Sequence, residues 1–501
     1  LATTIPIRNK MVQQHKRDNS TSLMQRSISS LSWNLVSSLV LVGVGFFRSI
    51  LLARWLPVEA FGVYSWAGSV IGLSGIIANF GLTKAFINRA PETQNETQAA
   101  SSYLTLRLII SGLWFILLNG YAIRYTTGNT RTALITLAVT TFLGAYMTQV
   151  PRFILVRRVM HQRLALLQIL DTLFATLSAL YLAWRGATLW ALLITDVVGC
   201  ALNIWILYFW KPVWRPSLSW NKKHFRYYLN FGRRQLMVDL LLNALDRVDD
   251  LWTGISLGDL AMGYYSRAYT FAAYPRKLIA APVNEVALGA YAELKGDRLR
   301  LSQAFFRFNA LLVRSGFLLA GLLALIAPEF IRLLLTDKWL PMLSAFQLML
   351  LYTLFDPLKL TISSVFIAMG RPERVARVHA IQLLILLIGL VTLGPRFNIV
   401  GVALAVNAML IVGISLLLWQ VREYVDYSLP KLFGIPSLGL GLGLACTYLA
   451  LQWPNATSSD WHTGAIKTVV FTLAYSVTLG LLERRNLKLL WATLRKQQLI
   501  G

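Results

Sequence analysis

Long apolar segments recur along almost the whole of this 501-residue chain, and no long polar interval separates them. A helix needs about twenty such residues to cross the roughly 30 Å hydrocarbon core of a bilayer, and we count about fourteen segments of that length. Membrane barrels instead use strands of about ten residues in which apolar and polar side chains alternate. We therefore expect an all-α polytopic membrane protein without a soluble domain of ordinary size. The expected spans are 32–54, 62–82, 102–123, 132–152, 164–184, 188–210, 234–257, 261–284, 304–327, 342–368, 375–394, 398–420, 431–453 and 464–483.

The charge of the chain is unevenly distributed along it. Charged residues make up only 14% of the sequence, against about 25% in soluble proteins, yet the formal net charge is +26. In a soluble protein such a charge would suggest a nucleic-acid partner. Lys and Arg instead fall in short loops between apolar segments, roughly thirty on one side of the expected membrane and about eight on the other. Because cytoplasmic loops retain positive charge, we expect an even number of spans, both termini in the cytoplasm and no nucleic-acid partner.

Neither metal nor covalent chemistry is indicated. Cys200 and Cys446 lie in separate apolar segments, so a disulfide framework or a paired-cysteine metal site is not expected. The five histidines lack metal-ligand spacing. Outer loops of about fifteen residues or fewer leave little room for catalysis, and no nucleophile elbow, P-loop or pair of catalytic carboxylates is found. About the first thirty residues lack the apolar core of a signal peptide. We expect a protein that is not an enzyme and holds no cofactor.

An internal repeat links the two halves of the chain. Residues 56–67 (LPVEAFGVYSWA) align with residues 257–268 (LGDLAMGYYSRA), with about half of the positions identical at an offset of about 201 residues. A repeat of six spans inserts twice in the same orientation, so two lobes related by an axis along the membrane normal should face a central cavity. The expected organisation is a cytoplasmic segment 1–31, an N-lobe 32–210, a cytoplasmic linker 211–233, a C-lobe 234–420, two extra spans in 421–483 and a cytoplasmic tail 484–501.

Cations at membrane depth are one functional signal. A charge near the bilayer centre costs a few kcal/mol, so such residues are expected to face water or one another. Arg267, Tyr274 and Lys277 share one face of the expected eighth span, and Arg276 adjoins them. Three cations on one helix favour an anionic partner. For Arg48 in the first span, snorkelling to the outer interface is an alternative to a cavity role.

An acidic stripe is the second signal. Asp239, Asp246 and Asp250 recur at helical spacing in the expected seventh span, with Asp249 beside them. One interpretation is a set of buried ion pairs that holds the lobe together, such as Arg247 with Asp250 at i, i+3. The other is that these carboxylates titrate or bind a cation during transport.

Several motifs resemble those of a known family. Residues 53–64 (ARWLPVEAFGVY) are similar to a signature of Wzx-type polysaccharide repeat-unit flippases, within the multidrug, oligosaccharidyl-lipid and polysaccharide exporter (MOP) superfamily. Residues 263–268 (GYYSRA) resemble the subgroup related to colanic-acid and lipopolysaccharide exporters, and 337–341 (DKWLP) and 368–372 (AMGRP) resemble further landmarks. Leu335-Thr336 departs from the Leu-Gly that is common in relatives. The resemblance covers most of the chain through about residue 420.

This resemblance implies fourteen helices in two lobes, alternating access, and a bacterial cytoplasmic membrane. It also implies an undecaprenyl-pyrophosphate-linked oligosaccharide as the substrate, for an O-antigen or exopolysaccharide. We expect a monomer whose partners are this lipid-linked anionic oligosaccharide, membrane lipids, and polysaccharide-assembly proteins such as a polymerase. The alternatives are a multidrug or cation antiporter of the same superfamily and a membrane glycosyltransferase or polymerase.

A lipid pyrophosphate carries about two negative charges, so its head group needs cations in a hydrated cavity. The side chains expected to contact it are Arg48, Tyr264, Arg267, Tyr274, Arg276, Lys277, Arg314 and Lys359. Transport is expected to be driven by the membrane potential or coupled to H⁺ or Na⁺. The carboxylates expected to carry such coupling are Asp239, Asp246, Asp249, Asp250 and Asp356.

Overall fold

The computed structural model describes residues 40–87, 96–157, 161–210, 212–453 and 459–483. Within these ranges the chain is almost entirely helical and contains no strand, so the expected all-α class is confirmed. The first half comprises a helix at 40–55, α2 (Val58–Asn79), α3 (Leu82–Ile87), α4 (Glu96–Tyr125), α5 (Gly128–Thr140), η1 (Thr141–Met147), α6 (Gln149–Arg157), α7 (His161–Trp184), α8 (Leu189–Ile204) and η2 (Trp205–Phe209). The second half comprises α9 (Lys222–Ala272), η3 (Arg276–Ala280), α10 (Ala281–Glu293), α11 (Arg298–Phe330), η4 (Ile331–Leu335), η5 (Asp337–Met342), α12 (Leu343–Ala368), α13 (Pro372–Val421), α14 (Leu429–Leu451) and α15 (Asp460–Leu482).

Two of the longest helices are broken at single residues. In α9 the break is at Gly258 (φ 85°, ψ 177°), a backbone conformation that glycine adopts without steric cost. In α13 it is at Asn398 (φ 50°, ψ −136°), and Gly401 then lies against the Leu393 carbonyl as the chain folds back. Nine of the described helices are long and apolar enough to cross a membrane, or ten if one bent pair is counted as a single span. This count treats α13 as one span although the helix is broken at Asn398. The total of about fourteen spans therefore stays a prediction.

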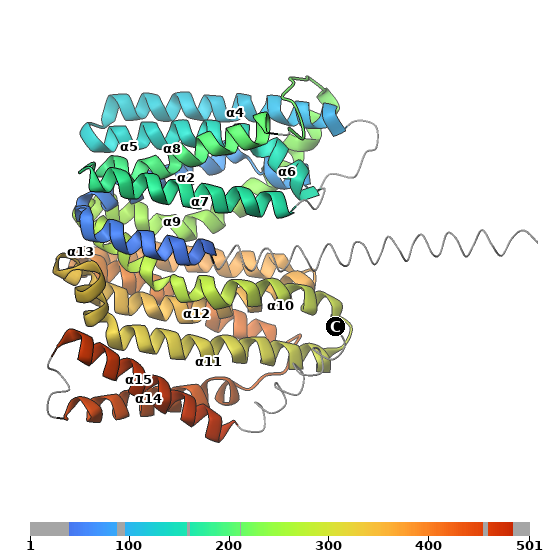
Figure 1. Ribbon diagram of the computed structural model, residues 1–501. Helices are drawn as coiled ribbons and strands as arrows, with labels where there is room; N and C mark the ends of the chain where they lie inside the picture. Colours follow the sequence, from blue (N-terminus) through green and yellow to red (C-terminus); the bar gives the residue numbers. More distant parts are fainter. Residues whose placement is uncertain (1–39, 88–95, 158–160, 211, 454–458, 484–501) are drawn as a thin grey trace, which may run out of the picture.

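The helices of the two halves gather in different parts of the molecule (Figure 1). In this view α2 and α4 to α8 lie above, α10 to α13 lie below, and α14 and α15 lie at the lower edge. One apolar core lies among α2, α4, α5 and α8, and a larger core joins helix 40–55 and parts of α2, α7 and α8 to the end of α9 and to α10 through α13.

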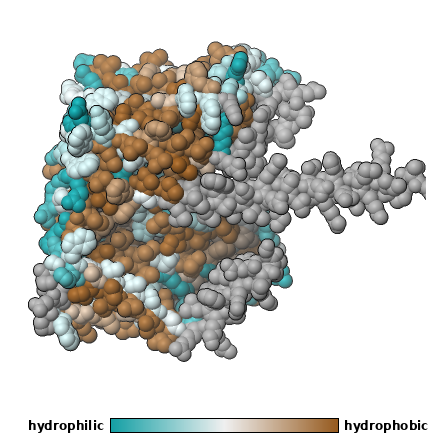
Figure 2. Space-filling view, in the orientation of Figure 1, coloured by the Kyte–Doolittle hydropathy of each residue, from teal (hydrophilic) through white to brown (hydrophobic). Residues whose placement is uncertain are grey.

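Apolar side chains cover the outside of these helices (Figure 2). On α4, for example, Leu113, Ile116 and Leu117 are each at least 60% exposed. Brown apolar atoms dominate the flank in Figure 2, and hydrophilic residues gather toward the ends of the helices. Such a surface is stable only against lipid, so the chain is a multi-pass protein embedded in a membrane.

The two copies of the internal repeat contact each other. Gly62 in α2 lies against the carbonyl of Asp259, and Gly263 in α9 lies against the carbonyl of Val58, so closely that a Cβ on either glycine would overlap the facing carbonyl. Val58 and Asp259 are equivalent positions of the repeat, as are the two glycines. The contact is therefore reciprocal, as expected across a pseudo-twofold axis.

A second contact joins the two halves at the same end. The Trp339 indole N–H in η5 donates to the Ala53 carbonyl at 2.9 Å. The Lys338 ammonium donates to the carbonyls of Arg54 and Leu56, each at 2.9 Å. These bonds use the carbonyls at the end of helix 40–55, which have no partner inside the helix.

The seventh expected span begins earlier than hydropathy indicates. The helix starts at Lys222 instead of 234, and the Asn221 side chain caps it by accepting from the backbone N–H groups of Lys223 and His224. The added turns carry Lys222, Arg226 and other polar residues, which an apolar window leaves out.

Candidate functional site

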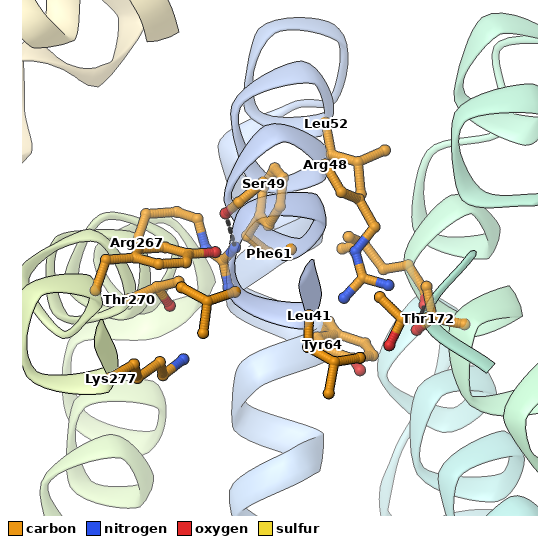
Figure 3. Close-up of a pocket in the computed structure, with 15 residues that line it drawn as sticks. Leu41, Arg48, Ser49, Leu52, Phe61, Tyr64, Thr172, Arg267, Thr270 and Lys277 are labelled. Carbon is orange, nitrogen blue, oxygen red and sulfur yellow. Dashed lines mark hydrogen bonds between the residues drawn. The ribbon is translucent and has the colours of Figure 1, made fainter. Parts of the chain in front are cut away.

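A cavity of 420 Å³ lies between helix 40–55, α2, α7, α8 and the end of α9 with η3. Three cations line it: Arg48, Arg267 and Lys277. Figure 3 shows Arg267 and Lys277 on one side of the space and Arg48 on the other, near Thr172. No carboxylate belongs to this lining among the described residues. We call this space the cation cavity.

Arg267 is held mainly by weak contacts. One terminal nitrogen donates to the Ser49 hydroxyl at 3.4 Å (Figure 3), and the guanidinium lies 4.6 Å from the centre of the Phe61 ring. Its Nε is buried and has no hydrogen-bond partner within the described ranges. A cation over an aromatic face gains about 0.5–2 kcal/mol and leaves the N–H groups of the guanidinium available as donors. Arg267 therefore retains capacity for an anionic ligand.

Lys277 and Arg48 likewise form no ion pair among the described residues. The Lys277 ammonium lies 5.2 Å from the centre of the Tyr274 ring, and that ring contacts Phe46 edge-on. In the part of the chain that the structure describes, no carboxylate oxygen lies within 4.0 Å of Arg48, Arg267 or Lys277. Three positive charges converging on one space favour an anion there.

Three other expected substrate contacts lie elsewhere. Arg276 and Lys359 both bind the carboxylate of Asp356, which is 2% exposed, and the Lys359 ammonium lies 2.8 Å from it. Arg314 forms a two-point ion pair with Glu483. These cations already have partners, so the structure does not bring them to the cation cavity. The sequence could not reveal this, because Arg276 is 80 residues from Asp356 and Arg314 is 169 residues from Glu483.

The expected aromatic contacts divide between the cavity and the core. Tyr274 lines the cavity. Tyr264 lies outside it and packs edge-on against Trp339, with ring centres 6.0 Å apart. Tyr64 lines the cavity but was not among the residues expected from the sequence. The sequence offered one signal, since Tyr64 is the repeat equivalent of Tyr265, which adjoins the expected contact Tyr264. The structure adds that Tyr64 donates to Asp196.

The expected coupling carboxylates are spread along α9 and α12. Asp239 forms an ion pair with Lys84 at 2.9 Å. Asp249 is buried and accepts a hydrogen bond from the Tyr265 hydroxyl at 2.6 Å. Asp246 lies within electrostatic range of Lys359 and its pair with Asp356.

The pair considered between Arg247 and Asp250 is not formed. Asp250 accepts instead from the Ser69 hydroxyl at 3.1 Å, whereas Arg247 lies over Gly72 and donates to the Gly68 carbonyl at 3.4 Å. No group of three or more metal-binding side chains occurs in the described ranges.

Residues 51–344, more than half of the chain, match a family model described as polysaccharide biosynthesis protein. The chain belongs to this family. Among curated members of similar sequence is the lipopolysaccharide biosynthesis protein WzxC of Escherichia coli K12. It is 23% identical over 392 residues, which cover 76% of this chain and 78% of WzxC.

Solved structures show that this family member has a transporter fold. The lipid II flippase MurJ, in an inward closed conformation, superimposes with a TM-score of 0.74 at 16% identity, over 92% of this chain and 100% of MurJ. A multidrug resistance MATE family transporter of the MOP superfamily, in an outward-facing conformation, gives a TM-score of 0.54 at 16% identity, over 79% of this chain and 95% of that one. The sequence expectation of an MOP-type fold is confirmed.

Proposed function

We propose that this family member is a flippase for an undecaprenyl-pyrophosphate-linked oligosaccharide. It moves this repeat unit of an O-antigen or exopolysaccharide from the inner to the outer leaflet of the bacterial cytoplasmic membrane, by alternating access. Both termini lie in the cytoplasm, and the protein works as a monomer beside the polymerase that consumes the unit. One observation carries the proposal: Arg48, Arg267 and Lys277 converge on a cavity that has no carboxylate lining among the described residues.

The charge and size of the cation cavity suit a lipid-linked pyrophosphate. Its two negative charges form charge-assisted hydrogen bonds with guanidinium and ammonium groups, which are roughly twice as strong as neutral ones. A volume of 420 Å³ lies within the range of about 300–1,000 Å³ that is usual for ligand sites, enough for the head group but not for a whole oligosaccharide. The prenyl tail stays in the bilayer between helices.

The contacts at one end of the molecule agree with alternating access. Gly62 and Gly263, together with Trp339, hold the outer ends of the two halves together in this conformation. Release to the outer leaflet requires these contacts to open. The Phe61 ring also packs edge-on against Trp339, so opening this end must separate apolar surface of the two halves as well as break these hydrogen bonds.

The two alternatives fit less well. An organic cation would need carboxylates in the cation cavity, where the described residues supply none. A glycosyltransferase or polymerase would need catalytic groups outside the membrane, and the relatives of known fold named above are transporters.

Neutralising the cavity cations tests the proposal in cells that lack the native protein. Arg48→Gln and Arg267→Gln should each abolish or strongly reduce surface polymer while the protein still reaches the membrane, because each removes a charge that holds the phosphates. Arg226→Gln, in the exposed cytoplasmic part of α9, is the matched control and should support normal polymer. Wild-type polymer from both cavity variants would refute the assignment.

The driving force is tested separately in proteoliposomes. Because the cytoplasm is negative, moving two negative charges outward is favoured by about 5 kcal/mol per 100 mV. We propose that this potential drives the cycle, so an imposed voltage should support flux without a pH or Na⁺ gradient. If flux is seen only when a proton or sodium gradient is added, transport is instead driven by coupling to that ion.

A further inference from the structure

A second cavity, of 340 Å³, adjoins the cation cavity. The two share Tyr64 and Thr270, which line both spaces. The second cavity lies among α2, α5, η1, α8 and both parts of α9, and its lining is rich in hydroxyl groups. It also holds two carboxylates, Asp196 and Asp250, and one cation, Arg247. We call it the hydroxyl pocket.

Each carboxylate of the hydroxyl pocket has one oxygen engaged. Oδ2 of Asp196 accepts from the Tyr64 hydroxyl at 2.8 Å, and Oδ2 of Asp250 accepts from the Ser69 hydroxyl at 3.1 Å. In the described ranges the Oδ1 atoms of Asp196 and Asp250 have no hydrogen-bond partner. Both Oδ1 atoms remain accessible, since neither is among the buried polar atoms that lack a partner. Each carboxylate is therefore oriented by a hydroxyl and presents a second oxygen that accepts from a ligand.

The single cation of the pocket does not neutralise these acids. Arg247 crosses α2 at Gly72, where a Cβ would collide with its guanidinium, and within the described ranges its one hydrogen bond goes to the Gly68 carbonyl at 3.4 Å. No carboxylate lies within 4.0 Å of it among the described residues. The lining of the pocket thus has two carboxylates and one guanidinium, and Arg48 and Arg267 of the adjoining cavity lie within electrostatic range of Asp196 and Asp250, respectively.

We propose that the hydroxyl pocket binds the first sugar of the substrate and favours a neutral hexose over a uronic acid. This inference rests on the proposed function. The first sugar is bonded directly to the pyrophosphate, so its site must adjoin the cation cavity. The hydroxyl pocket meets this condition, because Tyr64 and Thr270 line both spaces. Its hydroxyls donate to the free oxygens of Asp196 and Asp250 and accept from Arg247, whereas a carboxylate at C6 is repelled by the two aspartates.

The test measures binding to the purified full-length protein in lipid nanodiscs by native mass spectrometry. Three probes share one prenyl tail: undecaprenyl pyrophosphate, undecaprenyl-pyrophosphoryl-glucose and undecaprenyl-pyrophosphoryl-glucuronic acid. The wild type should bind the glucose probe at least about tenfold more tightly than the glucuronic acid probe, since an unfavourable charge contact of about 1.4 kcal/mol changes affinity tenfold.

Variants assign this preference to the pocket. The double variant Asp196→Asn with Asp250→Asn keeps the shape of both side chains and removes their charge, so the preference should fall to within about threefold. Its affinity for undecaprenyl pyrophosphate should stay within about twofold of the wild type, because the cation cavity is intact. Asp297→Asn, at the exposed N-cap of α11, is the matched control and should keep the full preference.

Three outcomes would count against the inference. Equal binding of both sugar probes by the wild type would overturn it while leaving the cation cavity as a pyrophosphate site. A double variant that keeps the preference but loses the H⁺ or Na⁺ dependence of transport would also overturn it and assign the pocket to ion coupling. If the wild type binds none of the three probes, the proposed function fails as well, and the two failures are thus distinguishable.

Discussion

Buried charges in this protein divide by whether the fold neutralises them. Asp356 holds two cations, Arg276 and Lys359, and Glu483 holds Arg314. Such groups fix helices to one another, because removing one partner leaves an uncompensated charge away from water. Arg267, by contrast, has only a weak hydroxyl contact and an aromatic ring. A cation left without a partner in the fold is the one available to a ligand.

This division predicts a structural effect for Asp356→Asn. The variant leaves Arg276 and Lys359 without a carboxylate, so the free energy of unfolding should fall by about 3–5 kcal/mol. The measurement is an SDS titration of the purified protein in mixed micelles. Asp460→Asn, in a half-exposed pair with Arg332, is the control and should change stability by less than about 1 kcal/mol. Wild-type stability with lost transport would instead make Asp356 a coupling group.

The sequence could predict which residues are ionisable at membrane depth but not which of them are free. Hydropathy and helical spacing singled out Arg48, Arg267 and Lys277 as cations at membrane depth, and the structure brings all three to one cavity. The same reasoning included Arg314, whose partner Glu483 follows α15 directly and is the last residue of the last expected span. Pairing over such separations depends on the tertiary fold, which spacing along one helix does not encode.

Among the helices, the reciprocal contact between α2 and α9 explains why the two repeat copies share a glycine. Gly62 and Gly263 let the backbones approach closely enough for each to meet the other's carbonyl. Any larger side chain would separate the two halves at this end of the molecule. The shared residues of the repeat therefore form an interface between the two halves, and they also connect two helices within each half.

Gly62→Ala should consequently open the outer end of the molecule. The added Cβ overlaps the Asp259 carbonyl, so Leu56, which is 2% exposed, should become accessible. In a protein whose native cysteines are replaced by serine, a Leu56→Cys side chain should react several-fold faster with a membrane-impermeant maleimide when Gly62→Ala is present.

Gly120→Ala is the matched control for this measurement, since nothing lies near a Cβ at that position. An unchanged labelling rate in the Gly62→Ala protein would mean that the contact does not close the outer end.

Most of the helical architecture was predictable because the bilayer imposes it. Apolar length identifies spans directly, and the break at Asn398 coincides with the first residue of the expected span 398–420. The early start of α9 at Lys222 was not predictable from hydropathy, because its first turns are polar and are stabilised by the Asn221 cap and by packing. One example of that packing is the close approach of Gly232 to the Phe80 carbonyl.

For the molecule as a whole, charge and shape combine into a transport path. Two halves related by an internal repeat meet at the end that we propose to be the outer one, and cations without an ion-pair partner among the described residues line the space between helix 40–55, α2 and α9. An acidic, hydroxyl-rich pocket adjoins that space. A ligand with an anionic head group and an uncharged polar group next to it matches the cation cavity and the hydroxyl pocket. The apolar outer surface of the helices allows the tail of this ligand to stay in the lipid.

The most direct measurement compares two ligands that differ only in the head group. Purified full-length protein in nanodiscs is titrated with undecaprenyl pyrophosphate and with undecaprenol, and the two dissociation constants are determined. The pyrophosphate should bind at least about tenfold more tightly, a difference of about 1.4 kcal/mol, and the Arg48→Gln, Arg267→Gln double variant should lose this advantage. Equal affinities of the wild type for both lipids would contradict an anion-binding role for the cation cavity.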